Sequence, residues 1–298
     1  MADAAGADDL ARRIAGLPCW RGAVDPQPLG GGITNTNFTV VDAARKFVVR
    51  LGGDIPIHQI SRANELAASR AAHAAGVSPS VIHSEPGVLV LDFIEGHTFS
   101  PQDVRDPRRH AALVALVKRC HTQIPRYFRG PAAIFWVFQV LRDYALTLKE
   151  GASPHLPLVQ GLMAEAEALE SAVGPVEIVF GHNDLLAANF LDDGQRLWLV
   201  DWDYAGFNSP LFDLGGLASN SELDADAAEN LLALYYERPV TDELRRRAAA
   251  MSAASLLRET MWSMVSEIHS SLAFDYAAYT AENLKRYRAA RDGVLAMA

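Results

Sequence analysis

Residues 181–203 read GHNDLLAANFLDDGQRLWLVDWD, and the polar positions of this segment decide how the chain is interpreted. Asp184 is placed to take the proton of an attacking hydroxyl, while Asn189 and Asp201 are placed to hold Mg²⁺ on the phosphates of ATP. Phosphoryl transfer needs positioning and charge neutralisation more than covalent chemistry, and oxygen ligands from two short loops supply both. The segment therefore predicts a site for phosphoryl transfer from ATP.

The residues around these polar positions favour short strands and tight turns. An apolar β-favouring run at 176–180 ends at Gly181, and a second run covers 197–200. Between the two, residues 192–194 read DDG, which is a hairpin signal. Asp and Asn are also common in solvated turns. The complete set in this strand-and-loop context favours a catalytic site over that alternative.

Composition limits the class of protein. The chain has 298 residues, enough for two lobes around a cleft, and a net charge of −9 without a basic tract, which argues against a nucleic-acid partner. Its two cysteines, Cys19 and Cys120, form no disulfide framework and fit a reducing cytosol. The N-terminus lacks the form of a secretory signal, and no apolar run reaches membrane-spanning length. We expect a cytoplasmic protein without a membrane partner, for which a homodimer is possible.

A glycine-rich turn near the N-terminus is the candidate phosphate-covering loop. Residues 29–41 read LGGGITNTNFTVV, and glycines at a strand turn let backbone N–H groups approach phosphate oxygens. The alternative is an ordinary glycine hairpin. The candidate nucleotide contacts in this loop are Gly31, Gly32, Thr34 and Asn35.

The next strand carries a cation for the phosphates. In residues 46–51, Phe47 and Val49 share one face and Lys46 and Arg50 the other, so either cation qualifies by type. A helix is predicted at 61–75, and its Glu65 is the natural ion-pair partner of that cation. The alternative is that the strand cation and Glu65 both face solvent.

Two strands, 81–83 and 88–93, lead to a hinge at about 92–96, where the backbones of Asp92 and Ile94 are candidates for pairing with adenine. This divides the chain into an N-terminal nucleotide-covering lobe, 1–93, and a C-terminal catalytic and acceptor-binding lobe, 97–298. Helices are predicted there at 106–123, 135–148, 158–172, 225–236, 242–270 and 274–291, and the helix at 242–270 is long enough to break. His121 is interpreted as a hydrogen-bonded packing residue. Asp213 is interpreted as a structural residue, which either caps a helix or orients the backbone of the catalytic loop.

Aromatic residues in the last third suggest how an acceptor could be held. Tyr204 follows the metal loop directly, Trp262 lies on one predicted helix, and Phe274, Tyr276 and Tyr279 lie on the next. Aromatic faces near an acidic centre bind quaternary ammonium groups by cation–π attraction. The alternative is that these rings are helix-packing core.

With these residues in hand, the chain resembles the choline/ethanolamine kinase family, in its bacterial branch, within the kinase-like aminoglycoside phosphotransferase group. The resemblance runs from about Gly30 to Tyr287. It is carried by GGITN at 31–35, KFVVRL at 46–51, GHND at 181–184 with Asn189, and DWDY at 201–204.

The resemblance implies an α+β, bilobal protein-kinase-like fold, with a small β-rich N-lobe and a larger, mainly helical C-lobe. It implies Asp184 as catalytic base, Asn189 and Asp201 as Mg²⁺ ligands, and Arg50 rather than Lys46 as the phosphate-contacting cation. It supports Glu65 as the partner of that cation. It also implies transfer of the γ-phosphoryl group of ATP to choline or a related amino alcohol. The aromatic residues implied around a trimethylammonium group are Tyr204, Trp262, Phe274 and Tyr279.

Two departures keep the acceptor open. Glu259 stands where the family often has a second tryptophan, and Asn220, with Glu222 close by, stands where an acidic pocket residue would be expected. Glu259 could face a cation by charge, or a primary amine by hydrogen bonds as well. Ethanolamine, thiamine and aminoglycoside acceptors stay open, as does a nucleotide-binding pseudokinase, against which the intact Asp184, Asn189 and Asp201 count.

Overall fold

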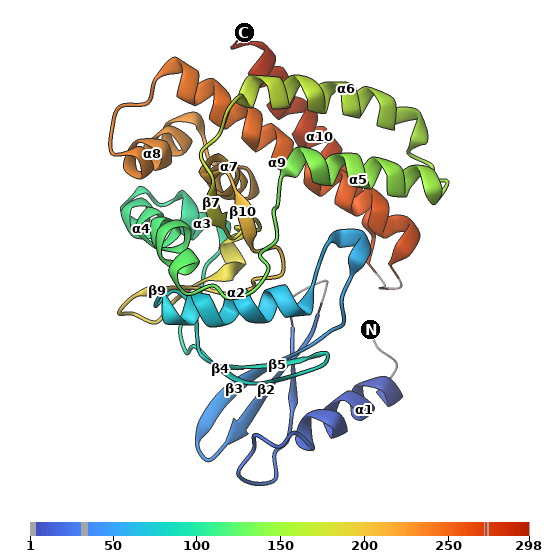
Figure 1. Ribbon diagram of the computed structural model, residues 1–298, viewed down its shortest axis with the longest axis vertical. Helices are drawn as coiled ribbons and strands as arrows, with labels where there is room; N and C mark the ends of the chain where they lie inside the picture. Colours follow the sequence, from blue (N-terminus) through green and yellow to red (C-terminus); the bar gives the residue numbers. More distant parts are fainter. Residues whose placement is uncertain (1–3, 31–34, 271, 273, 298) are drawn as a thin grey trace.

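A computed structural model describes residues 4–30, 35–270, 272 and 274–297, and divides into a β-rich N-terminal part and a larger helical part (Figure 1). This confirms the predicted fold class. Five antiparallel strands form the N-terminal sheet in the order β1-β2-β3-β5-β4. Their bounds are β1 (Gln27–Leu29), β2 (Thr36–Asp42), β3 (Arg45–Leu51), β4 (Val81–Glu85) and β5 (Val88–Asp92).

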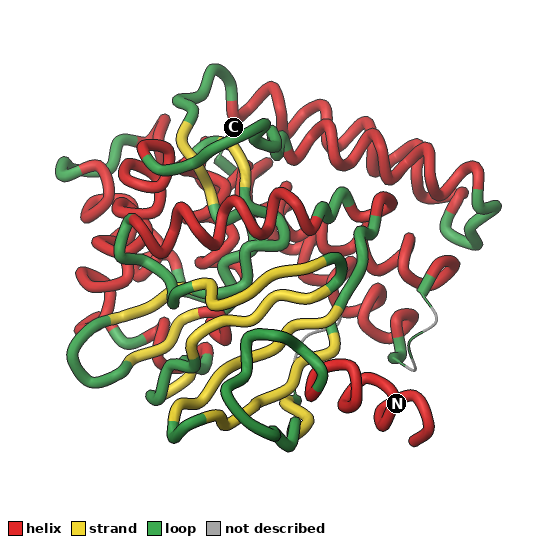
Figure 2. Tube along the Cα trace, turned by 60° about the horizontal axis from the view of Figure 1, so that its bottom comes forward, coloured by secondary structure: helices red, strands yellow, loops and turns green. Residues whose placement is uncertain are grey.

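The two faces of this sheet differ as the period-two pattern of β3 predicts. Phe47 and Val49 are buried in a small core that also contains Ile14 from helix α1 (Ala4–Ala15). Figure 2 shows α1 lying along the sheet. This helix was not predicted from the sequence; its apolar residues cover the face of the sheet that carries Phe47 and Val49. Arg50 points to the opposite side, toward helix α2 (Arg62–Ala74), which separates the sheet from the helical part (Figure 1).

The helical part is built around one long helix. Helix α9 (Asp242–His269) runs 28 residues without interruption, so a break in it was wrongly expected. It packs against α5, α6, α7 and α10, and its middle residues are buried all round. The other helices are α3 (Pro101–Arg105), α4 (Pro107–Gln123), α5 (Val137–Glu150), α6 (Leu156–Val173), α7 (Pro210–Asn220), α8 (Ala225–Tyr236) and α10 (Tyr276–Leu295).

Short strands carry the segment quoted from the sequence. Strands β8 (Phe190–Asp192) and β9 (Leu197–Leu199) form the predicted hairpin, which β6 (His97–Thr98) extends. Strand β7 (Val179–Gly181) pairs with β10 (Gly206–Asn208). A Cβ on Gly96 would lie 2.4 Å from the carbonyl oxygen of Asp192, so only glycine lets the chain after β5 press this closely on the hairpin.

The lobe boundary at 92–96 stays a prediction, although the sheet ends at Asp92 and β6 already joins the hairpin of the helical part. A second link between the two parts comes from the turn η1 (Pro56–His58), which follows β3. Its buried His58 ring lies against the Tyr144 and Ser266 hydroxyl groups of α5 and α9. Among the described residues, no helix is both long and apolar enough to cross a membrane.

We expect Ile14→Ala to lower the free energy of unfolding by about 2–5 kcal/mol, because the side chain is 0% exposed and its removal leaves a cavity between α1 and the sheet. Arg12→Ala on the exposed face of the same helix is the control and should change stability by about 0.5 kcal/mol or less. Urea unfolding measures both. Equal stabilities of the two variants would contradict a structural role for α1.

Candidate active site

A buried carboxylate holds the loop that carries the candidate base. Asp213, near the start of α7, accepts hydrogen bonds from the backbone N–H groups of His182 (2.8 Å) and Asn183 (2.7 Å). The His121 ring on α4 contacts the same carboxylate at 2.9 Å and the Tyr235 hydroxyl at 2.8 Å. The packing role predicted for His121 and the orienting role predicted for Asp213 are thus confirmed.

The loop itself is tightly constrained. Asn183 has a left-handed backbone (φ 66°), and its amide donates to the carbonyl oxygens of Tyr204 (2.9 Å) and Gly206 (3.1 Å). A Cβ on Gly181 would lie 2.6 Å from Asn183 Oδ1, so this position excludes any side chain. The loop is therefore fixed against the segment that follows Asp201.

His182 fixes the backbone of Asp184. Its Nε2–H donates to the Val200 carbonyl (2.9 Å), which leaves Nδ1 to accept from the Asp184 N–H (3.3 Å). Burial lowers the pKa of His182, so the ring stays neutral and can serve as this acceptor.

The Asp184 side chain is 22% exposed, and its nearest cation is Arg258, with Nη1 3.9 Å from Oδ1. Burial raises the pKa of Asp184 to about 7, although the charge of Arg258 opposes this and those of Glu259 and Asp201 add to it. A carboxylate with a pKa near neutrality can accept a proton and release it again.

Of the two predicted metal ligands, Asn189 is bonded to the Asp184 backbone and Asp201 is paired with Arg50. The Asn189 amide donates to the Asp184 carbonyl (2.9 Å), which leaves its side-chain oxygen available as a ligand. Asp201 has a left-handed backbone (φ 68°) and lies 2.8 Å from Nη2 of Arg50. Burial acts to raise the pKa of Asp201, but the charge and hydrogen bond of Arg50 hold it below its usual value. Asp201 is therefore ionised.

A charge cluster joins the sheet, α2 and the segment after β9. Arg50 Nε lies 2.9 Å from Glu65, and its Nη2 lies 3.0 Å from Asp203. Arg62, which sequence reasoning missed, contacts both Glu65 (2.8 Å) and Asp203 (2.7 Å) through Nη1. Asn35 also donates to Asp203, at 3.0 Å. The ion pair predicted between Arg50 and Glu65 is present, but it belongs to a larger network.

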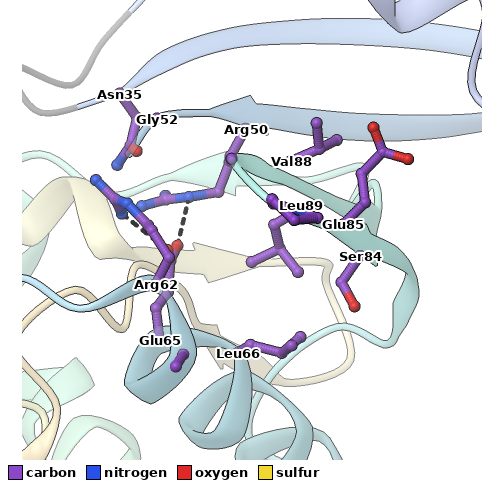
Figure 3. Close-up of a pocket in the computed structure, with 13 residues that line it drawn as sticks. Asn35, Arg50, Gly52, Arg62, Glu65, Leu66, Ser84, Glu85, Val88 and Leu89 are labelled. Atoms are coloured by element: carbon purple, nitrogen blue, oxygen red, sulfur yellow. Dashed lines mark hydrogen bonds and ion pairs between the residues drawn. The ribbon is translucent and has the colours of Figure 1, made fainter. Parts of the chain in front are cut away.

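Figure 3 shows Arg50 and Arg62 converging on Glu65, beside a pocket of about 300 Å³ between α2 and the β4–β5 hairpin. Burial alone would lower the pKa of Arg50, but the charges of Asp201, Glu65 and Asp203 outweigh it and raise the pKa. Arg50 is thus permanently charged and held by three carboxylates.

The other residues that were considered for contact with the nucleotide have different outcomes. Gly31, Gly32 and Thr34 lie outside the described residues. Lys46 points away from the charge cluster, with Nζ 3.3 Å from Glu95 and 3.7 Å from the centre of the Phe93 ring, in agreement with the choice of Arg50. The Asp92 N–H donates to the Ser80 carbonyl (3.0 Å), which leaves its carbonyl and the backbone of Ile94 as candidate adenine contacts.

The predicted aromatic residues do come together, but much of their surface is already used. Trp262 is 5% exposed; its indole N–H donates to the Tyr204 hydroxyl (3.0 Å), and its ring stacks on His58 with centroids 5.1 Å apart. Phe274 is 42% exposed and contacts the rings of Tyr276 and Tyr279. The open aromatic surface is therefore at Phe274 rather than at Trp262 or Tyr204.

The three residues at which the chain departs from the family pattern lie in two different places. Glu259 accepts from the Tyr279 hydroxyl (2.7 Å) and lines a cavity together with Asp184. Asn220 lines the same cavity, and its amide donates to the Leu185 carbonyl (3.3 Å). Glu222 pairs with Arg105 (2.8 Å) and is exposed.

Sequence reasoning also missed Arg258, the residue before Glu259. Its side chain is buried, its Nη1 lies 2.9 Å from Glu259 Oε2, and its guanidinium lies 4.2 Å from the centre of the Tyr204 ring. An arginine inside a helical pattern gives no sequence signal of burial, because most arginines lie at the surface.

Comparison with known proteins identifies the family of the chain. The family model described as choline/ethanolamine kinase matches residues 27–230. The chain belongs to the choline/ethanolamine kinase family. Protein LicA of Haemophilus influenzae is 28% identical over 259 residues, which cover 83% of this chain and 75% of that protein. Ethanolamine kinase 2 of Mus musculus is 23% identical over 286 residues, covering 86% of this chain and 73% of that protein.

A solved structure extends the likeness to the whole fold. The crystal structure of a choline/ethanolamine kinase family protein from Mesorhizobium loti is 29% identical, with a TM-score of 0.78 and 98% of both chains covered. This member of the choline/ethanolamine kinase family is therefore a kinase-like enzyme, a phosphotransferase with an alcohol group as acceptor.

We expect Asp213→Asn to lower the free energy of unfolding by about 3–5 kcal/mol, because an amide cannot satisfy two buried N–H donors and the His121 ring. Asp224→Asn, at the exposed N-cap of α8, is the matched control and should be nearly neutral, because Asn caps as well as Asp. Urea unfolding compares the two. A loss below about 1 kcal/mol in D213N would show that Asp213 does not hold the loop.

Proposed function

We propose that the enzyme transfers the γ-phosphoryl group of ATP to the hydroxyl group of a small amino alcohol of the choline and ethanolamine class. The observation that carries this proposal is the position of Asp184. Its backbone is bonded to Asn189, the charge of Asp201 acts on its carboxylate, and it shares a cavity with Glu259. A cytoplasmic location is part of the proposal, since ATP is the donor and both cysteines are free.

The donor set on the nucleotide side fits Mg²⁺. Asp201 supplies an ionised carboxylate and Asn189 an amide oxygen, which are the hard ligands that Mg²⁺ prefers. Among the described residues, no group of three or more His, Cys, Asp or Glu side chains forms a metal site. This suits Mg²⁺, which is bound through few carboxylates plus substrate phosphates and, when bound, neutralises phosphate charge.

On this proposal Arg50 and Asp184 have different roles in the reaction. Arg50 contacts the phosphates, and its three carboxylates keep the guanidinium oriented. Asp184 accepts the proton of the attacking hydroxyl, for which its raised pKa is suited. Hydrogen bonds to the backbone N–H and the carbonyl oxygen of Asp184 keep its carboxylate in place. Positioning therefore supplies much of the rate acceleration.

The acceptor side favours a primary ammonium over a quaternary one. Glu259 offers carboxylate oxygens that can accept N–H hydrogen bonds, which a trimethylated nitrogen cannot donate. The faces of Trp262 and Tyr204 are engaged by His58 and Arg258, which leaves mainly Phe274 for cation–π contact. We therefore propose ethanolamine, or a similar primary amino alcohol, ahead of choline.

The alternatives receive less support. The cavity beside Asp184 measures only about 10 Å³, so an acceptor as large as an aminoglycoside or thiamine needs a far larger rearrangement than ethanolamine does. A pseudokinase would not need the pKa of Asp184 to be shifted toward neutrality or its backbone to be fixed by two neighbours.

We expect Asp184→Asn to lower kcat by at least about 10²-fold while Mg·ATP binding, measured by calorimetry, survives. The pKa of Asp184 is about 7 in the fold but about 4 in an unfolded chain, so its ionisation opposes folding at pH 8. The variant should therefore be at least as stable as the wild type at that pH. Retention of more than about a tenth of kcat would remove Asp184 as the base.

A second prediction concerns the acceptor. We expect the wild type to prefer ethanolamine to choline in kcat/KM, and Glu259→Gln to lower the value for ethanolamine by about 10- to 100-fold, since a hydrogen bond to a charged group is lost. The exposed Glu222→Gln is the matched control and should change neither value.

Choline preferred by the wild type, with the preference lost in Phe274→Ala or Trp262→Ala, would restore the aromatic cage and overturn the choice of a primary amine. Turnover of neither compound by folded wild type would remove the amino-alcohol proposal and leave the family assignment intact.

A further inference from the structure

Arg258 is the most unusual charged residue near the base. It is 4% exposed, lies in the middle of α9, and stacks on the face of Tyr204. Its Nη1 is shared between Glu259 at 2.9 Å and Asp184 at 3.9 Å. Its Nε and Nη2 are buried and have no hydrogen-bond partner among the described residues. A buried guanidinium with unmet donors lacks an acceptor that a bound group could supply.

The electrostatics of the cavity indicate which group this is. The cavity beside Asp184 is also lined by Asp213 and Glu259, and Arg258 is the one Lys or Arg among the described residues that line it. A phosphoryl group that arrives at the acceptor hydroxyl brings negative charge into this acidic surrounding. Without a cation on this side, that charge would be repelled.

We propose that Arg258 is a catalytic residue that binds the phosphoryl group as it passes from ATP to the acceptor. The inference rests on the proposed kinase function. In this step the acceptor oxygen forms a bond to the γ-phosphorus, the bond from that phosphorus to the β–γ bridging oxygen breaks, ADP leaves, and the hydroxyl proton passes to Asp184. Arg258 donates hydrogen bonds to oxygens of the moving group.

The unpartnered Nε and Nη2 donors of Arg258 make its contribution specific to the transition state. Nε and Nη2 have no acceptor within the part of the chain that the structure describes. On this proposal they gain acceptors when the phosphoryl group reaches the acceptor side. An interaction that is made in the transition state but not in the substrate complex raises kcat rather than lowering KM.

Arg50 cannot replace Arg258 in this role. Arg50 is held on the nucleotide side by Glu65, Asp201 and Asp203. The two arginines thus lie on different sides of the transfer, one with the departing phosphates and one with the acceptor.

The test compares Arg258→Met and Arg258→Lys with the wild type, using choline, ethanolamine and water as acceptors of the γ-phosphoryl group. We expect R258M to lower kcat by about 10²–10³-fold with each acceptor, while the KM values for Mg·ATP and amino alcohol change by less than about threefold. R258K keeps a point charge without the planar fork and should retain activity between the two. Arg247→Met, on the same helix but bonded to the Val173 carbonyl, is the matched control and should keep wild-type kcat.

A folded R258M that retains more than about a third of kcat, or whose loss lies entirely in the KM for the amino alcohol, would overturn the proposal and leave Arg258 as a positioning residue for Glu259. If R258M does not fold, R258K decides by the same criterion. If the wild type phosphorylates neither amino alcohol, the proposed function fails by itself. The ratio of wild-type to R258M ATP hydrolysis then decides the role of Arg258.

Discussion

The candidate active site depends on one buried carboxylate. Asp213 lies at the point where α7 meets the loop after β7, and it accepts two backbone N–H groups of that loop while His121 closes the other side. Because a buried carboxylate without partners is costly, loss of any one of these four groups destabilises the arrangement of the others. The position of Asp184 is then determined by the backbone and does not depend on any interaction of its own side chain. This leaves the carboxylate free to be poorly solvated and chemically useful.

Features coded by neighbouring residues could be predicted from the sequence. The β8–β9 hairpin follows from a turn signal between two short strand runs, and the alternation in β3 predicts that Arg50 faces away from Phe47. Asp184, Asn189 and Asp201 belong to one short segment, so their proximity follows from its strand-and-loop pattern. Most helices were likewise predicted to within a few residues, because their apolar periodicity is a local property.

The features that could not be predicted depend on contacts between residues that are far apart in the sequence. Arg62 and Arg258 look like ordinary surface arginines in sequence, and only folding brings carboxylates to them from 141 residues away in one case and 74 in the other. The aromatic residues were predicted as a group, but which of their faces stay open depends on His58, which arrives from the turn after β3. Helix α1 was missed because its apolar face packs on a sheet formed by later residues, and that contact cannot be read from the sequence of the helix alone.

The long unbroken α9 has a consequence for how such enzymes diversify. Glu259 and Trp262, which we place on the acceptor side, lie within one turn of this helix, whereas the residues proposed to contact the nucleotide come from β3, α2 and the segment 181–203. The helix also packs against its neighbours α7 and α10, which hold its backbone. On the proposed assignment, acceptor choice and nucleotide binding therefore depend on different elements of the fold. On that assignment, exchange of Glu259 or Trp262 changes the alcohol that is accepted and leaves the residues for ATP unaltered.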